Sequence, residues 1–162
     1  MVKFYLKAKG YLEHLNNVQP LDNAESPYEY IFIIECTKCR EEHNKPVSIN
    51  RFEQHEISGS RGEASFVFRC KACKSEHSAL ILRTAEKITA DNNGEWARIL
   101  EIDARGIDFK RFVPEGRWEG SGLETDTKFD EIDLEEGEWF DYDEKAKEMA
   151  GITEVEFDIA RL

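Results

Sequence analysis

All four cysteines of this 162-residue chain occur in two C-x-x-C pairs, Cys36 and Cys39 in ECTKCREEH, and Cys70 and Cys73 in RCKACKSEH. A thiolate is both a nucleophile and a soft metal ligand, so such pairs can do redox chemistry or bind a metal. Two pairs supply the four sulfurs of a closed tetrahedral Zn²⁺ site, with Zn–S distances of about 2.3 Å. We therefore predict a structural Zn²⁺ site formed by these four cysteines.

A histidine follows the second cysteine of each pair by four residues, at His43 and His77. Four sulfurs already complete a tetrahedral ion, so neither imidazole is needed as a ligand. We predict that both histidines are exposed or lie beside the ligands. Five cations lie within or next to the pairs, and we predict that they offset the negative charge of a zinc–thiolate centre: Lys38, Arg40, Arg69, Lys71 and Lys74.

Three other uses of the cysteines remain open. The 30 residues between the pairs also suit a rubredoxin-type iron site, although CTKCRE and CKACKS lack the Pro and Gly common around such cysteines. A thioredoxin-like dithiol would leave the second pair without a role. Disulfides are the least expected use, because reduced glutathione keeps intracellular thiols free.

The segments around the cysteines have the composition of β-strands. YIFII precedes the first pair and SFVFR precedes the second, and β-branched and aromatic runs of this length favour strands. A strand ending in each pair is the arrangement of a zinc ribbon. SALILRT, WARILEIDARG and ITEVEFDIARL extend the same pattern, so we predict a mainly β protein.

A weak internal repeat predicts two similar β-sandwich or barrel-like halves. Without gaps, residues 97–114 align with residues 3–20, which places Leu100 on Leu6 and Pro114 on Pro20. We predict a zinc-binding half at residues 1–90 and an acidic half without metal at residues 91–162.

The segment DEKAKEMA, residues 143–150, predicts one short C-terminal helix. Asp141 or Asp143 can cap its first turn, and acidic residues suit the positive end of a helix dipole. Gly151 can adopt the left-handed conformation that ends many helices.

The net charge of −12 is distributed unevenly along the chain. Residues 30–90 carry ten basic and eight acidic side chains, whereas residues 91–162 carry nine and twenty-two. Such acidity repels a phosphate backbone, so we expect no nucleic-acid partner. We expect a protein partner, bound through the acidic C-terminal half.

No apolar run approaches the roughly 20 residues that span a bilayer, and MVKFYLKAKGYLEHL does not read as a signal peptide. We therefore expect a cytoplasmic protein in a reducing compartment, monomeric and not membrane-bound. No Ser-His-Asp or Cys-His arrangement can be defended as a nucleophilic site, so we do not expect an enzyme. Metal transfer or thiol redox chemistry by the C-x-x-C pairs is the alternative function.

Three stretches together resemble the eukaryotic CXXC-motif-containing zinc-binding proteins: CTKC, GSRGEASFVFRCKAC and EWFDYDEK. The resemblance covers essentially the whole chain and implies a β-rich fold of two similar halves. It also implies that the four cysteines of the first half hold zinc. The molecular role of that family is not established. We predict that the aromatic residues of EWFDYDEK, which are Trp139, Phe140 and Tyr142, wedge the following helix against the body. A recognition patch is the alternative role for these residues.

Overall fold

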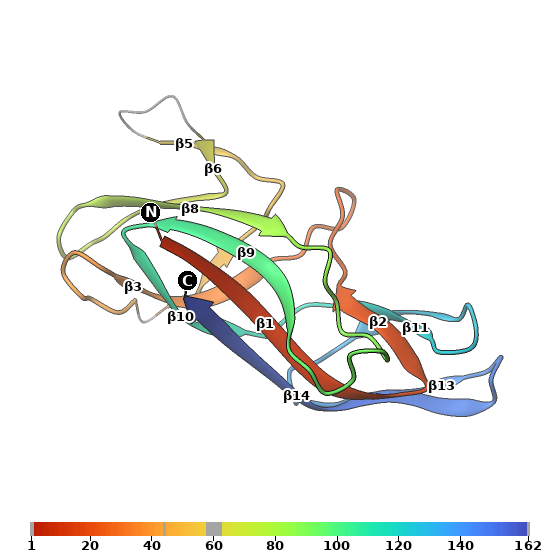
Figure 1. Cartoon of the computed structure of the whole chain (residues 1–162). Helices are drawn as coiled ribbons and strands as arrows, with labels where there is room; N and C mark the ends of the chain where they lie inside the picture. Colours follow the sequence, from red (N-terminus) through yellow and green to blue (C-terminus); the bar gives the residue numbers. More distant parts are fainter. Residues whose placement is uncertain (1, 44, 58–62, 162) are drawn as a thin grey trace.

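The fold is built from β-strands that run along an elongated molecule (Figure 1). A computed structural model describes residues 2–43, 45–57 and 63–161. In these ranges the chain forms fourteen strands and no helix, so the predicted β class is confirmed. No described helix could cross a bilayer. Residues 59–62, the GSRG of the stretch GSRGEASFVFRCKAC, lie outside the described residues.

Among the described residues, the largest sheet has six strands in the order β13-β14-β1-β9-β8-β7, and all neighbours are antiparallel. Its strands, in that order, are β13 (Trp139–Asp143), β14 (Glu148–Arg161), β1 (Val2–Glu13), β9 (Ala97–Arg105), β8 (Glu76–Arg83) and β7 (Phe66–Arg69).

Two three-stranded antiparallel sheets complete the core of the described chain. One has the order β10-β3-β4, with β10 (Ile107–Val113), β3 (Tyr30–Cys36) and β4 (Val47–Ile49). The other has the order β12-β11-β2, with β12 (Lys128–Ile132), β11 (Trp118–Gly122) and β2 (Leu15–Pro20). A small hairpin, β5 (His55–Glu56) with β6 (Glu63–Ala64), stands off the body (Figure 1).

These strand orders are symmetric about the pair β1 and β9. Each central strand is flanked by a hairpin, β14 with β13 on one side and β8 with β7 on the other. The order β10-β3-β4 likewise repeats as β2-β11-β12. The two predicted similar halves are thus confirmed in the topology.

Each half contains a corner at which one strand passes from the large sheet into a small one. The chain turns at His14 (φ 52°) between β1 and β2, and at Gly106 (φ 78°) between β9 and β10. The structure therefore aligns Gly106 with His14, whereas the predicted alignment placed Gly106 on Leu12. That alignment was wrong by two residues because it followed apolar positions, and left-handed corners do not require similar side chains.

One apolar core lies between the sheets and joins both halves. Leu6 and Leu100 are fully buried and pair across β1 and β9. On β14, Phe157 packs its ring against Trp118 and Phe112, with ring centroids 5.7 and 5.1 Å away. The predicted boundary near residue 90 falls between β8 and β9, which pair with each other. The described core is therefore continuous across that boundary.

The predicted helix at residues 143–150 is wrong, because this segment contains the last residue of β13, the hairpin turn at residues 144–147 and the first residues of β14. The Asp143 carboxylate accepts from the amides of Lys145 and Ala146, as a helix cap would. The Lys147 amide then donates to the Asp143 carbonyl at 2.7 Å, and Lys147 adopts φ 59°. Lys147 is therefore the left-handed residue that ends the helical geometry after a single turn. Gly151, the predicted end of the helix, lies within β14.

Candidate metal centre

Each C-x-x-C pair lies in a tight turn, or knuckle, defined here as residues 36–41 and residues 70–75. In the first, Cys36 donates its amide to the Glu41 carbonyl (3.0 Å) and accepts from the Arg40 amide (2.8 Å). Arg40 adopts φ 63°, which lets the chain turn back. The second repeats this geometry: Cys70 donates to the Ser75 carbonyl (2.9 Å) and accepts from the Lys74 amide (2.9 Å), with Lys74 at φ 65°.

The two knuckles bring all four predicted site residues together. Their Sγ atoms lie within 4.8 Å of one another. Two pairs are closer, Cys36 with Cys73 at 3.7 Å and Cys39 with Cys70 at 3.6 Å. Zn–S bonds of about 2.3 Å in a tetrahedron require sulfurs about 3.8 Å apart, whereas a disulfide requires about 2.05 Å. The cluster therefore fits Zn²⁺.

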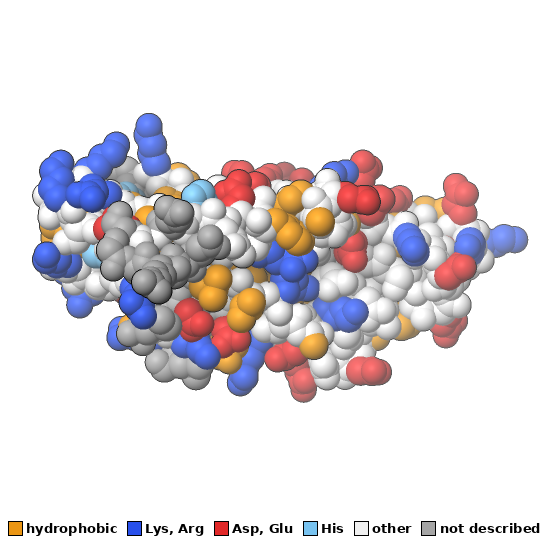
Figure 2. Space-filling view, turned by 90° about the horizontal axis from the view of Figure 1, so that it is seen from above, with side chains coloured by type: hydrophobic (Ala, Val, Ile, Leu, Met, Phe, Trp, Pro, Cys, Tyr) orange, Lys and Arg blue, Asp and Glu red, His pale blue; other side chains and the backbone are white. Residues whose placement is uncertain are grey.

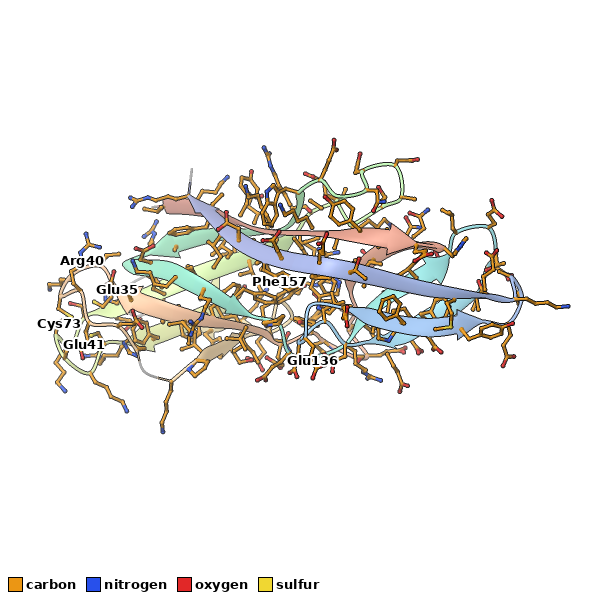
Figure 3. The ribbon with its side chains drawn as sticks, turned by 90° about the horizontal axis from the view of Figure 1, so that it is seen from below. Glu35, Arg40, Glu41, Cys73, Glu136 and Phe157 are labelled. Atoms are coloured by element: carbon orange, nitrogen blue, oxygen red, sulfur yellow. The ribbon has the colours of Figure 1, made fainter. Side chains whose placement is uncertain are left out.

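The sulfur cluster is buried on one side and open on the other. Cys36 and Cys70, the first cysteines of the pairs, are fully buried at the strand ends. Cys39 is exposed and Cys73 is half-buried. Figure 3 shows Cys73 at the end of the molecule, in the same region as Glu41.

The thiols differ in acidity when protons occupy the cluster. Ser75 donates from its backbone amide and its side chain to Cys73, which lowers the pKa of that thiol to about 6. At Cys39, the Glu41 amide acts to lower the pKa, but partial desolvation and bonds with the other thiols raise it to about 12. A bound cation would displace these protons from all four sulfurs.

The two matching histidines have different environments, which spacing did not reveal. The buried His77 places Nε2 3.1 Å from the Cys36 sulfur. His43 lies against the Phe68 ring at 4.5 Å between centroids, and its buried Nε2 has no hydrogen-bond partner. Within the described residues, the group of potential metal ligands consists of the four cysteines and includes neither histidine. Only His77 contacts a cysteine.

Lys and Arg side chains gather at the cysteine end, on the left of Figure 2. Two of the five predicted cations bind nearby carboxylates, Arg40 with Glu35 at 3.6 Å and Arg69 with Glu76 at 3.8 Å. The three lysines of the knuckles are exposed: Lys38, Lys71 and Lys74. Their predicted role in charge compensation stays a prediction.

The second half contains the same knuckle geometry without cysteine. Gly122 donates its amide to the Thr127 carbonyl (2.9 Å), as Cys36 does to Glu41. The Asp143 carbonyl accepts from Lys147, as Cys70 accepts from Lys74. Position by position, the four cysteines are replaced in the order of the chain by Gly122, Thr125, Asp143 and Ala146.

A hydrogen-bond cluster joins these two turns. The hydroxyls of Thr125 and Thr127 donate to the two carboxylate oxygens of Asp143, at 2.6 and 2.7 Å. These bonds hold the pKa of the buried Asp143 below its usual value. Gly122 is required for space, because a Cβ there would lie 2.1 Å from the Thr125 hydroxyl. GLETDT shares no residue type with CTKCRE at equivalent positions, so sequence reasoning missed this cluster.

Comparisons with known proteins agree with the site and the fold. Residues 5–160 match the family model of the eukaryotic CXXC motif containing zinc binding protein. The chain is 36% identical over 161 residues to a UPF0587 protein of Schizosaccharomyces pombe, which covers 99% of both chains. It is 38% identical over 157 residues to the CXXC motif containing zinc binding protein of Xenopus laevis, which covers 96% of both.

Solved structures share the whole fold. The crystal structure of C1orf123 superposes with a TM-score of 0.89 at 33% identity, covering 99% of both chains. A hypothetical protein from Plasmodium falciparum superposes with a TM-score of 0.86 at 21% identity, covering 98% of this chain and 99% of that one, and this likeness shows the fold alone. The chain belongs to the eukaryotic family of CXXC motif containing zinc binding proteins.

Proposed function

We propose that this protein is a non-enzymatic protein-interaction module whose first half is held in shape by one Zn²⁺ bound to Cys36, Cys39, Cys70 and Cys73. The observation that carries the proposal is the convergence of four sulfurs at separations suited to a tetrahedral ion. A site with four protein ligands leaves no position for a substrate, which supports a structural role for the metal.

Metal analysis of Cys70→Ser tests the zinc assignment. We expect about one zinc per wild-type molecule, and loss of zinc with a lower unfolding temperature in the variant. Lys71→Ala is the matched control, because Lys71 lies exposed in the same knuckle and offers no sulfur. A variant with normal zinc content and an unchanged melting curve would refute the assignment.

The surroundings of the sulfurs support a non-enzymatic role. A hollow of about 450 Å³ beside the knuckles is lined by residues such as His43, Lys45 and Lys71, and by none of the cysteines. In the described ranges, the four cysteines are the only grouping of three or more potential metal ligands. Assays with hydrolase and dithiol substrates should therefore give no turnover.

The partner-binding surface in this proposal lies at the acidic end, on the β13–β14 hairpin. Phe140, Tyr142 and Met149 are about half exposed there, and Tyr142 pairs directly with Met149. Only Trp139 of the predicted wedge packs inward, against Phe129 at 5.4 Å. Exposed aromatic side chains among acidic residues are suited to bind a partner protein whose surface carries basic and apolar side chains. The acidic residues repel the phosphates of nucleic acid.

Cross-linking in cells, followed by mass spectrometry, tests this surface. Tyr142→Ser with Met149→Ser should remove a partner captured by the wild type, and Lys71→Ala at the opposite end should keep it. We propose that the protein is a monomer in a reducing cytoplasmic compartment, not bound to membranes. Sedimentation would contradict the monomer if it gave twice the chain mass.

Thiol redox or metal-transfer activity is the second candidate function, and the exposure of Cys39 favours it. Thiol titration of the native protein separates the two functions. In a structural zinc site only the exposed Cys39 should react at first, and the other thiols should follow as zinc is released. A working dithiol instead presents two thiols that react at once, without release of zinc.

A further inference from the structure

The contact between His77 and Cys36 occurs in the first half and has no counterpart in the second. Three observations describe it: the burial of both groups, the residue at the equivalent position, and the space left by Gly106. The imidazole is buried, and its Nε2 approaches the equally buried Cys36 sulfur at 3.1 Å. The equivalent position in the second half is Ala150, which has no polar side chain. The ring also needs Gly106, because a Cβ there would lie 2.0 Å from His77 Nδ1.

The proposed zinc site decides which of the two atoms, His77 Nε2 or Cys36 Sγ, donates the hydrogen bond. A zinc-bound thiolate carries no proton, so the Cys36 sulfur can only accept, and Nε2 must carry the hydrogen. A hydrogen bond to a ligating sulfur withdraws electron density and lowers its nucleophilicity. Burial of Cys36 further excludes reagents in solution from this sulfur.

Cys39 differs from Cys36 both in exposure and in the contacts of its sulfur. Its side chain is exposed, and within the described residues the contacts of its sulfur are with the other cysteines and the Glu41 amide. In the part of the chain that the structure describes, His43 Nε2 has no hydrogen-bond partner and so does not bond to this sulfur, although His43 occupies the same place in the sequence repeat as His77. The four thiolates should therefore differ widely in reactivity.

We propose that Cys39 is the modification site of this protein for soft electrophiles, and that His77 is a positioning residue that protects Cys36. The inference rests on the proposed zinc site. The Cys39 sulfur attacks the electrophilic carbon, a C–S bond forms, and the leaving group departs with the electron pair of the broken bond. A thioether is a poor zinc ligand, so modification of one exposed cysteine weakens metal binding by the whole cluster.

Timed alkylation of the zinc-loaded protein with iodoacetamide tests the proposal. The sulfur displaces iodide, and peptide mass mapping locates each carbamidomethyl group while a chromogenic chelator measures released zinc. We expect Cys39 to react first, zinc release to follow with the same time course, and Cys36 to react last. Early alkylation of Cys36 would overturn the assignment of Cys39.

Two variants of His77 separate hydrogen bonding from packing. His77→Leu removes the donor, and we expect alkylation of Cys36 to accelerate roughly tenfold relative to Cys39. His77→Gln keeps an N–H donor at a similar reach and should restore most of the protection. His43→Leu is the matched control, and its alkylation order should equal that of the wild type.

The outcomes distinguish this inference from the proposed function. A wild-type protein without zinc would refute the zinc site itself. A zinc-loaded protein in which His77→Leu and His43→Leu behave alike would refute only the role of His77.

Discussion

Removing zinc from the folded protein should open the two knuckles and leave the sheets closed. The perturbation is a chelator at neutral pH, with the Cys70→Ser variant as a second route to the same state. The expectation follows from where the core lies. Leu6 and Leu100 lie on the central strands β1 and β9 and are buried in the apolar core, whereas the four cysteines lie outside the apolar core cluster.

The magnitude can be worked from the knuckles themselves, residues 36–41 and 70–75. Ordering the backbone of these residues costs about 12–24 kcal/mol at about 1–2 kcal/mol each. The four backbone hydrogen bonds within the knuckles offset only about 2–6 kcal/mol net. Structural zinc contributes about 10–16 kcal/mol in small zinc-finger peptides, which closes the difference. Without metal, the knuckles therefore cannot stay closed.

Hydrogen exchange with mass spectrometry checks this expectation. In the zinc-loaded protein, the amides of Arg40 and Lys74 should be protected, because each donates to the carbonyl of the first cysteine. After chelation they should exchange as in an open loop, while the amides of β1 and β9 stay protected. Protection that persists in the knuckles, or is lost together with that of β1 and β9, would refute the reasoning.

Two further predictions concern the second half and the core. Asp143→Asn should destabilise the protein at pH 7, because the depressed pKa of Asp143 contributes stability above its unfolded value. That stability is lost as the pH falls through the folded pKa, so urea melts of variant and wild type should converge in acid; a gap independent of pH would contradict the prediction. Leu100→Ala should lower the free energy of unfolding by about 2–5 kcal/mol with zinc content unchanged, whereas the exposed Leu82→Ala should change it little.

The metal-binding cluster is the part of the molecule that the sequence predicts best. Cysteine spacing and two preceding strands suffice, because few other residues can replace a thiolate in a zinc site. The environment of the histidines was not predictable, since His43 and His77 share one spacing and differ only in tertiary contacts.

The errors lie where short local signals compete with sheet formation. Asp143 does cap a turn, so the sequence signal was read correctly over four residues. Pairing of β13 with β14 then prevailed over helix propagation, as tertiary context commonly does. The cluster around Asp143 was also hidden, because hydrogen bonds among Thr and Asp can form in many sequences.

The corners at His14 and Gly106 show how the two halves depend on each other. The Thr37 amide in the first knuckle donates to the Gly106 carbonyl (3.0 Å), and Leu123 donates to His14 (3.2 Å). Each half thus completes the turn of the other. Two strand pairs also join the halves, because β10 pairs with β3 and β2 pairs with β11.

Such reciprocal exchange has an evolutionary consequence. If the halves arose by duplication, the single-length ancestor would have closed its sheets only against a second copy, as a two-fold homodimer with two metal sites. Gene fusion would then have freed one site to lose its cysteines. Separately expressed pieces 1–90 and 91–162 should accordingly fold when mixed and not alone, and independent folding of either piece would exclude this history.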